Sequence, residues 1–349
     1  MLMFKSFRQK FTHNLAIDLG TCKTMLSEPQ SGLFLSEPTI VAVNKKTDQI
    51  LAVGTAAKAM IGKNPAHIEI IKPLVDGVVS DFEVTEKLLK YFIDQTQENN
   101  FFLAPKPTVI IGIPLDITEV EKKAVEDAAK SAGTRKVFLV EEPMLSAIGA
   151  GLPVMEATAT MLVDIGGGTT EIAVLALGGC VAWKTLRLAG NAFNNEIIQY
   201  IREEFSLLIG EQLAEEIKIK IGSAIPRAEP LTMAIRGRDL INGLPKEIII
   251  GDEHIREAIA RPLGQIIDNI KATLEVTPPE LVADIYERGI MLTGGSSLLF
   301  GFDQAIARAT KIGVHIVDEP ISSVVRGAAY LLSNQSLLDK IVSPSLADL

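Results

Sequence analysis

Two acidic residues stand at the same position in two similar segments of the chain. Residues 15–24 read LAIDLGTCKT and residues 161–170 read MLVDIGGGTT, which aligns Asp18 with Asp164 at an offset of 164 − 18 = 146 residues. In each segment an apolar run ends in the acid, a turn of Gly and Thr follows, and a second apolar run begins (residues 171–177 in the second copy). This pattern predicts two β-hairpins, each with a carboxylate and a run of backbone N–H groups at its tip.

The tips of these hairpins have the composition of an anion site. Glycine lets the backbone approach a ligand closely, successive N–H groups form a concave site for phosphate, and Thr hydroxyls add donors. A carboxylate at a strand end supplies a hard oxygen ligand for Mg²⁺, which keeps several waters and meets nucleotide phosphates. A single such hairpin is a weak signal, because many are plain turns. The pair predicts that both tips hold one polyphosphate, with Asp18 and Asp164 flanking the metal.

Two further groups have the chemistry to complete a nucleotide site. The sequence TGGSS at residues 293–297 follows an apolar run and leads into residues 298–309, where we expect a helix whose N-terminus would suit a nucleoside or its phosphates. The alternative is an ordinary helix-entry loop. Glu215 and Lys218 are spaced i, i+3 on one predicted helical face, where they form either a solvated surface ion pair or hydrogen bonds to a ribose.

Strands and helices alternate along the chain in the way needed to position these groups. Residues 109–114 and 136–140 are apolar runs typical of buried parallel strands, and a capping box at residues 118–121 opens a helix between them that ends near Gly133. Further helices are predicted at residues 81–97, 194–205, 212–221 and 254–275. The β-α-β pattern and the internal duplication predict an α/β protein of two similar lobes that face each other.

Composition removes several classes of function. The 349 residues carry a net charge of −9, which argues against a nucleic-acid-binding protein, since such a protein needs Lys and Arg to neutralise phosphates. The four histidines have no metal-ligand spacing and no Ser/His/Asp signature is present, which disfavours a zinc enzyme or a triad hydrolase. No apolar run reaches the ~18–20 residues of a membrane span, and no secretory signal is recognised. Two cysteines, Cys22 and Cys180, are too few for a disulfide framework and suit a reducing cytoplasm.

Two apolar segments predict contact with a membrane surface. Residues 1–14 contain three basic residues and no acid, and on a helix their phenylalanines fall within about 60° of one another. A large apolar triplet, Phe-Phe-Leu at residues 101–103, lies between two asparagines and a proline-containing loop. The alternatives are a frayed terminus for the first segment and burial in the core for the second. The residues expected at the membrane are Met3, Phe4, Phe7, Phe11, Phe101, Phe102 and Leu103.

In this order the motifs resemble the superfamily of sugar kinases, heat-shock chaperones and actin, and within it the MreB family of bacterial actin homologues. The resemblance covers nearly the whole chain, and the segment before residue 86 and TPPEL at residues 277–281 are specific to MreB. It rests on IDLGT at 17–21, LAVG at 51–54, DGVVSDFEVTE at 76–86, EEPM at 141–144, AIGAGLPV at 147–154, VDIGGGTTEIAV at 163–174, RGRDL at 236–240, TPPEL at 277–281 and ERGIMLTGG at 287–295.

The resemblance implies an actin-like, duplicated ribonuclease H-like α/β fold, in which two lobes of two subdomains each enclose a nucleotide cleft. The implied boundaries are 1–42, 77–156 and 321–349 for subdomain IA, 43–76 for IB, 157–192 and 254–320 for IIA, and 193–253 for IIB.

The resemblance also implies ATP and Mg²⁺ as ligands and assigns the site residue by residue. Glu142 matches the catalytic glutamate and Thr169 the threonine that positions water, while Asp18 and Asp164 meet the metal, through water. The implied nucleotide contacts are Thr21, Cys22 and Lys23 on the first phosphate loop, Gly166, Gly167, Gly168 and Thr169 on the second, Glu215 and Lys218 at the nucleoside, and Gly294, Gly295, Ser296 and Ser297 by the base and α-phosphate.

Three departures from the family pattern leave the rate of hydrolysis open. The first loop reads Thr-Cys-Lys-Thr where the family usually has Thr-Ala-Asn-Thr, so Lys23 adds a positive charge, either in a surface salt bridge or at the phosphates. Ser296 stands where the family has the third of three glycines. Asn191 and Asn194 replace two carboxylates. Nucleotide binding is still expected.

The function that the resemblance implies is an ATP-dependent cytoskeletal filament that controls cell shape by organising wall synthesis during elongation. Such proteins form polar protofilaments that pair antiparallel on the inner face of the cell membrane, with lipid, elongation membrane proteins and adaptors as partners, so the expected location is cytoplasmic and peripheral on that membrane. One alternative is a divergent paralogue with weak ATPase whose filaments serve another task. A second is a small-molecule kinase, for which residues 35–80 leave little room for an acceptor site. A chaperone would need a further domain after the ATPase.

Overall fold

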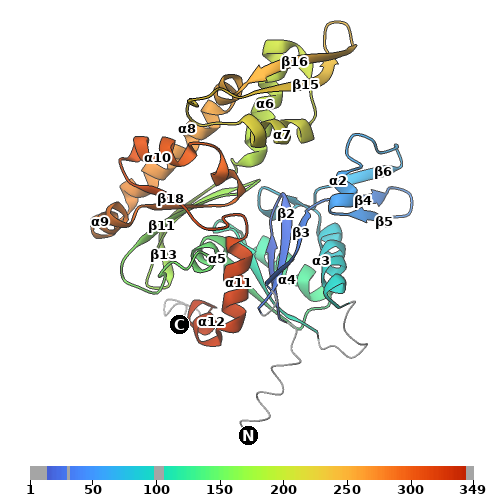
Figure 1. The fold of residues 1–349 in the computed structure, drawn as a ribbon. Helices are drawn as coiled ribbons and strands as arrows, with labels where there is room; N and C mark the ends of the chain where they lie inside the picture. Colours follow the sequence, from blue (N-terminus) through green and yellow to red (C-terminus); the bar gives the residue numbers. More distant parts are fainter. Residues whose placement is uncertain (1–13, 30–31, 98–105, 343–349) are drawn as a thin grey trace. The chain divides into compact units, whose positions relative to one another are not determined.

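The structure is a computed structural model that describes residues 14–29, 32–97 and 106–342. The chain divides into two compact units, drawn in Figure 1. The first comprises Met1–Glu156, Leu177–Gly179 and Ser322–Leu349, and the second Ala157–Ala176 and Cys180–Ile321. The finer division into four subdomains stays a prediction.

The first unit is built on a five-stranded sheet in the order β10-β9-β1-β2-β3. β1 lies parallel to β9, and β9 parallel to β10, whereas β1 and β2 form the predicted antiparallel hairpin. Because β9 is buried on both faces, its side chains are almost all apolar. The strands are β1 (Asn14–Leu19), β2 (Lys23–Glu28), β3 (Gly32–Pro38), β9 (Thr108–Ile113) and β10 (Lys136–Glu141).

Helices cover both faces of this sheet. Apolar side chains of α3 (Phe82–Gln97) and α4 (Glu119–Ser131) form one core with one face of β1 and β9. The predicted capping box at the start of α4 is confirmed, since Thr118 and Glu121 bond each other's backbone N–H. On the other face α5 (Glu142–Gly149) and α11 (Ser323–Ser333) lie side by side (Figure 1).

Smaller elements complete the first unit. A three-stranded sheet in the order β5-β4-β6 carries one short helix, and a two-stranded ribbon precedes α3. Their bounds are β4 (Val41–Asn44), β5 (Ile50–Val53), β6 (Ile68–Ile71), β7 (Leu74–Val75), β8 (Val78–Val79) and α2 (Thr55–Lys58), and α12 (Gln335–Val342) follows α11.

The second unit repeats the five-stranded topology of the first. Its order is β13-β12-β11-β17-β18, in which β11 is antiparallel to β12 and parallel to β17, and β17 is parallel to β18. Asp18 pairs with Met25 and Asp164 pairs with Glu171, so both partners are displaced by the same 146 residues. The predicted duplication is therefore confirmed down to the strand register. The strands are β11 (Thr160–Ile165), β12 (Thr170–Ala176), β13 (Gly179–Leu186), β17 (Ile290–Thr293) and β18 (Val314–Ile316).

The rest of the second unit comprises further helices and a small sheet in the order β14-β15-β16. Apolar side chains of α6 and α8 pack against β11 and β12 in one continuous core. The bounds are α6 (Gly190–Phe205), β14 (Leu207–Leu208), α7 (Glu211–Ile221), β15 (Thr232–Asp239), β16 (Pro245–Gly251), α8 (Asp252–Val276), α9 (Pro279–Arg288) and α10 (Phe302–Thr310).

Two predicted helix starts were wrong. α6 begins at Gly190, four residues before the predicted Asn194, because backbone bonds from its first turn to residues 166 and 167 hold a start of low helix propensity. After TGGSS the helix begins at Phe302 and not at residue 298. Gly295–Leu298 form a separate 3₁₀ turn, and Gly301 in a left-handed conformation divides it from α10.

None of the described helices is both long and apolar enough to cross a membrane. The residues predicted to contact a membrane surface (Met3, Phe4, Phe7, Phe11, Phe101, Phe102 and Leu103) lie outside the described residues, and their role stays a prediction.

Candidate functional site

The second loop, residues 166–169 between β11 and β12, is held in place by hydrogen bonds that its carbonyl groups accept. The Gly166 carbonyl accepts hydrogen bonds from the Gly190 N–H (3.2 Å) and from the Ser296 hydroxyl (2.7 Å). The Gly167 carbonyl accepts one from the Asn191 N–H (2.8 Å). Two successive carbonyls of the loop are thus turned toward the N-terminus of α6.

This fixes the direction of the loop N–H groups. Every described peptide bond is trans, and in a trans peptide the N–H points opposite to the carbonyl of the same unit. The N–H groups of Gly167 and Gly168 therefore point away from α6. Together with the N–H of Thr169, they have no hydrogen-bond partner among the described residues. Three consecutive backbone N–H donors on one loop form a concave site of the kind that binds an anion such as phosphate.

The first loop, residues 20–22 between β1 and β2, is held in a related way. The Thr39 hydroxyl donates to the Gly20 carbonyl (2.6 Å), the counterpart of the Gly166 carbonyl at the 146-residue offset. Thr39 also bonds the Thr24 hydroxyl (2.9 Å), and the Gly77 N–H donates to the Thr21 hydroxyl (2.8 Å). Cys22 and Lys23 are exposed, and Lys23 forms no ion pair with any described residue. The salt-bridge alternative for Lys23 is therefore not realised in the described part of the chain.

The two predicted metal-site carboxylates are buried at equivalent strand positions. Asp18 and Asp164 are only 9% and 8% exposed. Among the described residues no three His, Cys, Asp or Glu side chains group around a common point, so these carboxylates do not belong to an all-protein metal cage. One carboxylate beside a phosphate loop does fit Mg²⁺, which is commonly held by one or two carboxylates, waters and the phosphates of the substrate.

The Gly294 loop packs directly on Asp164. Thr293, the last residue of β17, pairs with Asp164 in the sheet, and a Cβ at Gly294 would overlap the Ile165 carbonyl. The Gly294 N–H and the Thr293 hydroxyl both bond the Pro320 carbonyl (2.9 and 3.0 Å). The TGGSS segment is therefore fixed beside the second loop by sheet pairing.

Glu215 and Lys218 form an ion pair, but the alternative of a solvated surface pair is wrong for the lysine, since only the Glu215 side chain is substantially exposed, at 37%. The Lys218 side chain is 10% exposed, and its ammonium bonds Glu215 (2.9 Å) and the Gly190 carbonyl (2.9 Å). The amide of Asn194 donates to the same Glu215 oxygen (2.6 Å). The α7 pair is thus tied to the first turn of α6, which itself holds the second loop.

Glu142 begins α5 directly after β10. A Cβ on Gly112 of β9 would stand 3.1 Å from the Glu142 side chain, so the bare glycine leaves room for the carboxylate stem. β10, β9 and β1 are parallel neighbours, and Glu142 and Asp18 follow or end them at the same carboxyl edge of the sheet. In open α/β sheets this edge is where ligands bind.

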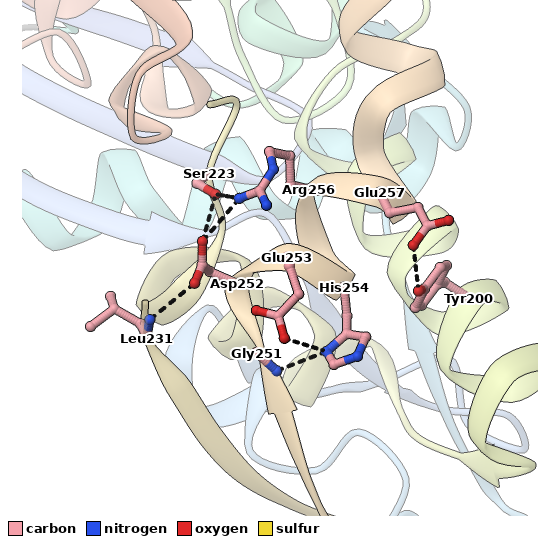
Figure 2. Close-up of polar contacts among 9 residues, drawn as sticks. All are labelled: Tyr200, Ser223, Leu231, Gly251, Asp252, Glu253, His254, Arg256 and Glu257. Atoms are coloured by element: carbon pink, nitrogen blue, oxygen red, sulfur yellow. Dashed lines mark hydrogen bonds and ion pairs between the residues drawn. The ribbon is translucent and has the colours of Figure 1, made fainter. Parts of the chain in front are cut away.

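A charged cluster lies at the first turn of α8 (Figure 2). The Asp252 carboxylate accepts from the Leu231 N–H (3.0 Å), Arg256 (3.0 Å) and the Ser223 hydroxyl (3.5 Å). Burial opposes its ionisation, but the Leu231 N–H and the Arg256 guanidinium outweigh burial and hold the pKa of Asp252 below its ordinary value. The cluster joins the first turn of α8 to residues 223–231, the segment that continues from α7.

Aromatic side chains pack against the same N-terminal end of α8. His254 Nδ1 accepts the Gly251 N–H (2.9 Å), and its ring meets the edge of Phe205. The Tyr200 hydroxyl donates to Glu257 (2.8 Å), and burial together with this carboxylate raises the pKa of Tyr200 to about 12 (Figure 2). Tyr200 therefore remains a neutral donor that ties α6 to α8.

Each unit thus gathers one part of the predicted site. The first unit holds Asp18, Thr21, Cys22, Lys23 and Glu142, and the second holds Asp164, Gly166, Gly167, Gly168, Thr169, Glu215, Lys218, Gly294, Gly295, Ser296 and Ser297. Sequence reasoning missed Thr39 and Gly190. Thr39 carries no motif signal, whereas Gly190 adjoins the Asn191 departure already noted.

A family model described as MreB/Mbl protein matches residues 12–340. The cell shape-determining protein Mbl of Bacillus cereus is 44% identical over 330 residues, which cover 95% of this chain and 98% of that protein. The cell shape-determining protein MreB of Escherichia coli K12 is 44% identical over 334 residues, with 95% and 96% covered.

A solved structure is also similar over nearly the whole chain. MreB5 of Spiroplasma citri bound to ADP superposes with a TM-score of 0.89 at 32% identity, covering 95% of this chain and 99% of that one. The same protein bound to AMPPNP gives a TM-score of 0.89 at 33% identity, covering 95% and 98%.

Proposed function

This chain belongs to the MreB/Mbl family and has its actin-like fold, and from that premise we propose that it is an ATP-dependent cytoskeletal protein that forms filaments and takes part in determining cell shape. The relatives at 44% identity are named cell shape-determining proteins, and their matches cover 95% of this chain. ADP and AMPPNP are the ligands of the similar MreB5 structures.

The nucleotide part of the proposal is carried by the second loop. Its three N–H groups have no partner within the described residues, and they follow Asp164, which is buried and lies opposite Thr293 in the parallel pairing of β11 with β17. In the proposal these donors and the first loop bind the phosphates of one nucleotide, and Asp18 and Asp164 hold Mg²⁺ through water. The bound ion neutralises the phosphate charge.

The remaining site residues follow the same assignment. Glu215 and Lys218 bind the ribose, and residues 294–297 lie by the base and α-phosphate. Glu142 and Thr169 position the water that attacks the terminal phosphate. Phosphoryl transfer depends mostly on positioning and charge neutralisation, which are the two tasks that the proposal gives these groups.

The filament part rests on family membership and symmetry. A head-to-tail contact between identical subunits gives an open filament when its rotation does not close a ring. ATP favours the assembling state only to the extent that it binds that state more tightly. We propose polar protofilaments that pair antiparallel on the inner face of the cell membrane, with the wall-elongation machinery as partner.

Calorimetry and electron microscopy of the full chain test this function. We expect heat of binding with ATP and Mg²⁺, weaker binding when EDTA replaces the metal, and filaments in the nucleotide-bound sample. Asp18→Ala and Asp164→Ala are each expected to lower affinity for ATP with Mg²⁺ more than for ATP with EDTA. No heat with either form of ATP would contradict the proposal.

A further inference from the structure

We propose that Ser296 is a positioning residue for the nucleotide phosphates, and that it acts through the second loop and not by touching the nucleotide. The inference rests on the proposed function, because it takes the second loop to be the phosphate site. It gives this chain's departure from three consecutive glycines a defined physical role.

The starting observation is the long-range bond from Ser296 to the second loop. The hydroxyl is half-buried in the Gly295–Leu298 turn and donates to the Gly166 carbonyl at 2.7 Å, across 130 residues of sequence. A serine hydroxyl has one proton to donate, and this bond uses it. The proton is therefore not available to a phosphate oxygen.

The bond determines which way the loop presents its donors. The Gly166 carbonyl and the Gly167 N–H belong to one planar trans peptide, so holding the carbonyl holds the N–H. The only other bond to this carbonyl from a described residue, that from the Gly190 N–H, is longer at 3.2 Å. Residues 166–168 are all glycine, the residue with the greatest backbone freedom. Without Ser296, a bound phosphate would have to order this peptide at the expense of affinity.

Packing around Gly190 leaves little room for another arrangement. A Cβ on Gly190 would stand 2.7 Å from the Ser296 hydroxyl, 3.1 Å from the Lys218 ammonium and 3.3 Å from the Gly166 carbonyl. Lys218 also bonds the Gly190 carbonyl at 2.9 Å. Ser296, Lys218 and the second loop therefore pack around Gly190, which has no side chain. Because the packing is close, movement of one of these groups would displace the others.

The first loop gives independent support. There the equivalent carbonyl, that of Gly20, is held by the Thr39 hydroxyl at 2.6 Å. Thr39 follows β3 and Ser296 follows β17, so the two hydroxyls come from different places in the repeated topology. Two unrelated residues thus donate to the equivalent carbonyl of two related loops. This indicates that fixing the orientation of this carbonyl is the common requirement of both loops.

The test compares ligands with and without a phosphate chain on the full-length protein. Wild type and Ser296→Ala are titrated with ADP and AMPPNP in the presence of Mg²⁺ by calorimetry, and with adenosine by ligand-observed NMR. Loss of one neutral hydrogen bond predicts about three- to tenfold weaker binding of ADP and AMPPNP by Ser296→Ala. Adenosine affinity should stay within about twofold, and Ser296→Thr, which keeps the hydroxyl, should restore the wild-type values.

Ser333→Ala is the matched control, since within the part of the chain that the structure describes the Ser333 hydroxyl bonds only a carbonyl of its own helix, in the other unit. Should Ser296→Ala fail to fold, Ser296→Cys replaces it, because a thiol is a poor donor. An equal loss for adenosine would mean direct contact with the nucleoside and overturn the proposal, and so would unchanged ADP and AMPPNP affinity. If wild type itself binds neither nucleotide, the proposed function fails first and this inference fails with it.

Discussion

At the scale of single residues, Asp252 shows how this chain keeps a charge inside a folded unit. The residue is 3% exposed, yet a backbone N–H, a guanidinium and a hydroxyl all bond its carboxylate (Figure 2). An ion this buried is tolerated only when it is paired and fully hydrogen-bonded. Because these bonds join α8 to the segment after α7, the charge of Asp252 contributes to the stability of the second unit.

This predicts a loss of stability in acid. A carboxylate whose pKa is lowered on folding stabilises the protein above its unfolded pKa of about 4, and the stabilisation is lost as the pH falls through the lower folded value. Urea unfolding between pH 3 and 7 should show the decline below about pH 4. Asp252→Asn should cost about 3–5 kcal/mol at neutral pH and flatten the acid decline. Asp268→Asn, at a side chain 76% exposed, is the control that should change neither.

Glu142 and its neighbour Glu141 allow a matched test of the proposed catalytic role. Glu142 starts α5 beside Gly112, whereas Glu141 is exposed at the end of β10. Glu142→Ala should keep nucleotide affinity and filaments but lower phosphate release about 100-fold or more, the contribution typical of a general base. Glu141→Ala should release phosphate at the wild-type rate. Loss of nucleotide affinity in Glu142→Ala would instead indicate a binding role.

At the scale of elements, α5 and α11 are in close contact in the first unit. A Cβ on Gly327 of α11 would overlap the Leu145 carbonyl of α5, and one on Gly149 would overlap the Ser323 carbonyl. These two glycines allow the helix backbones to touch. α5 begins with Glu142, so the contact also positions the proposed catalytic carboxylate.

Gly327→Ala should therefore destabilise the first unit by about 1–3 kcal/mol, the usual cost of overpacking. Gly264→Ala is the control, because a Cβ there meets nothing within 4 Å in the middle of α8. This second change should stabilise the protein by about 1 kcal/mol through helix propensity. Chemical denaturation distinguishes the two, and equal effects would show that the α5–α11 contact adapts to a methyl group.

Elements with a local signal could be predicted from the sequence, and elements fixed by distant contacts could not. Both hairpins and α4 were predicted, since strand alternation, turn glycines and the Thr118–Glu121 box are readable in a short window. The start of α6 was not, because Gly190 and Asn191 become helical only through bonds to residues 166 and 167. The same reason explains Thr39, whose bond to Gly20 spans 19 residues and has no sequence pattern.

At the scale of the whole molecule, the duplication is the feature that sequence predicts best. The 146-residue offset between Asp18 and Asp164 holds for their strand partners, and five strands follow in the same spatial order in each unit. The insertions that follow the repeats differ, with a small sheet after β3 and α6 to α8 after β13. The shared part carries the two loops that we propose bind phosphate, whereas Thr39, Gly190 and Ser296, which hold them, follow the repeated strands.

We predict that membrane binding is a property of the assembled protein. Full burial of a large apolar side chain is worth roughly 1.5–3 kcal/mol. Four or five partly inserted side chains from residues 1–14 and 101–103 would therefore contribute only several kcal/mol per subunit, before the entropic cost of ordering them is subtracted. That is marginal for one copy and ample for a filament, in which linked sites act together. Binding to anionic vesicles should therefore require ATP-dependent assembly, and the combined change Phe101→Ser with Phe102→Ser should reduce co-pelleting while filaments persist in solution. Equal pelleting of this variant and wild type would remove the 101–103 segment from the membrane contact, and equal pelleting with and without nucleotide would show that single subunits bind the vesicles.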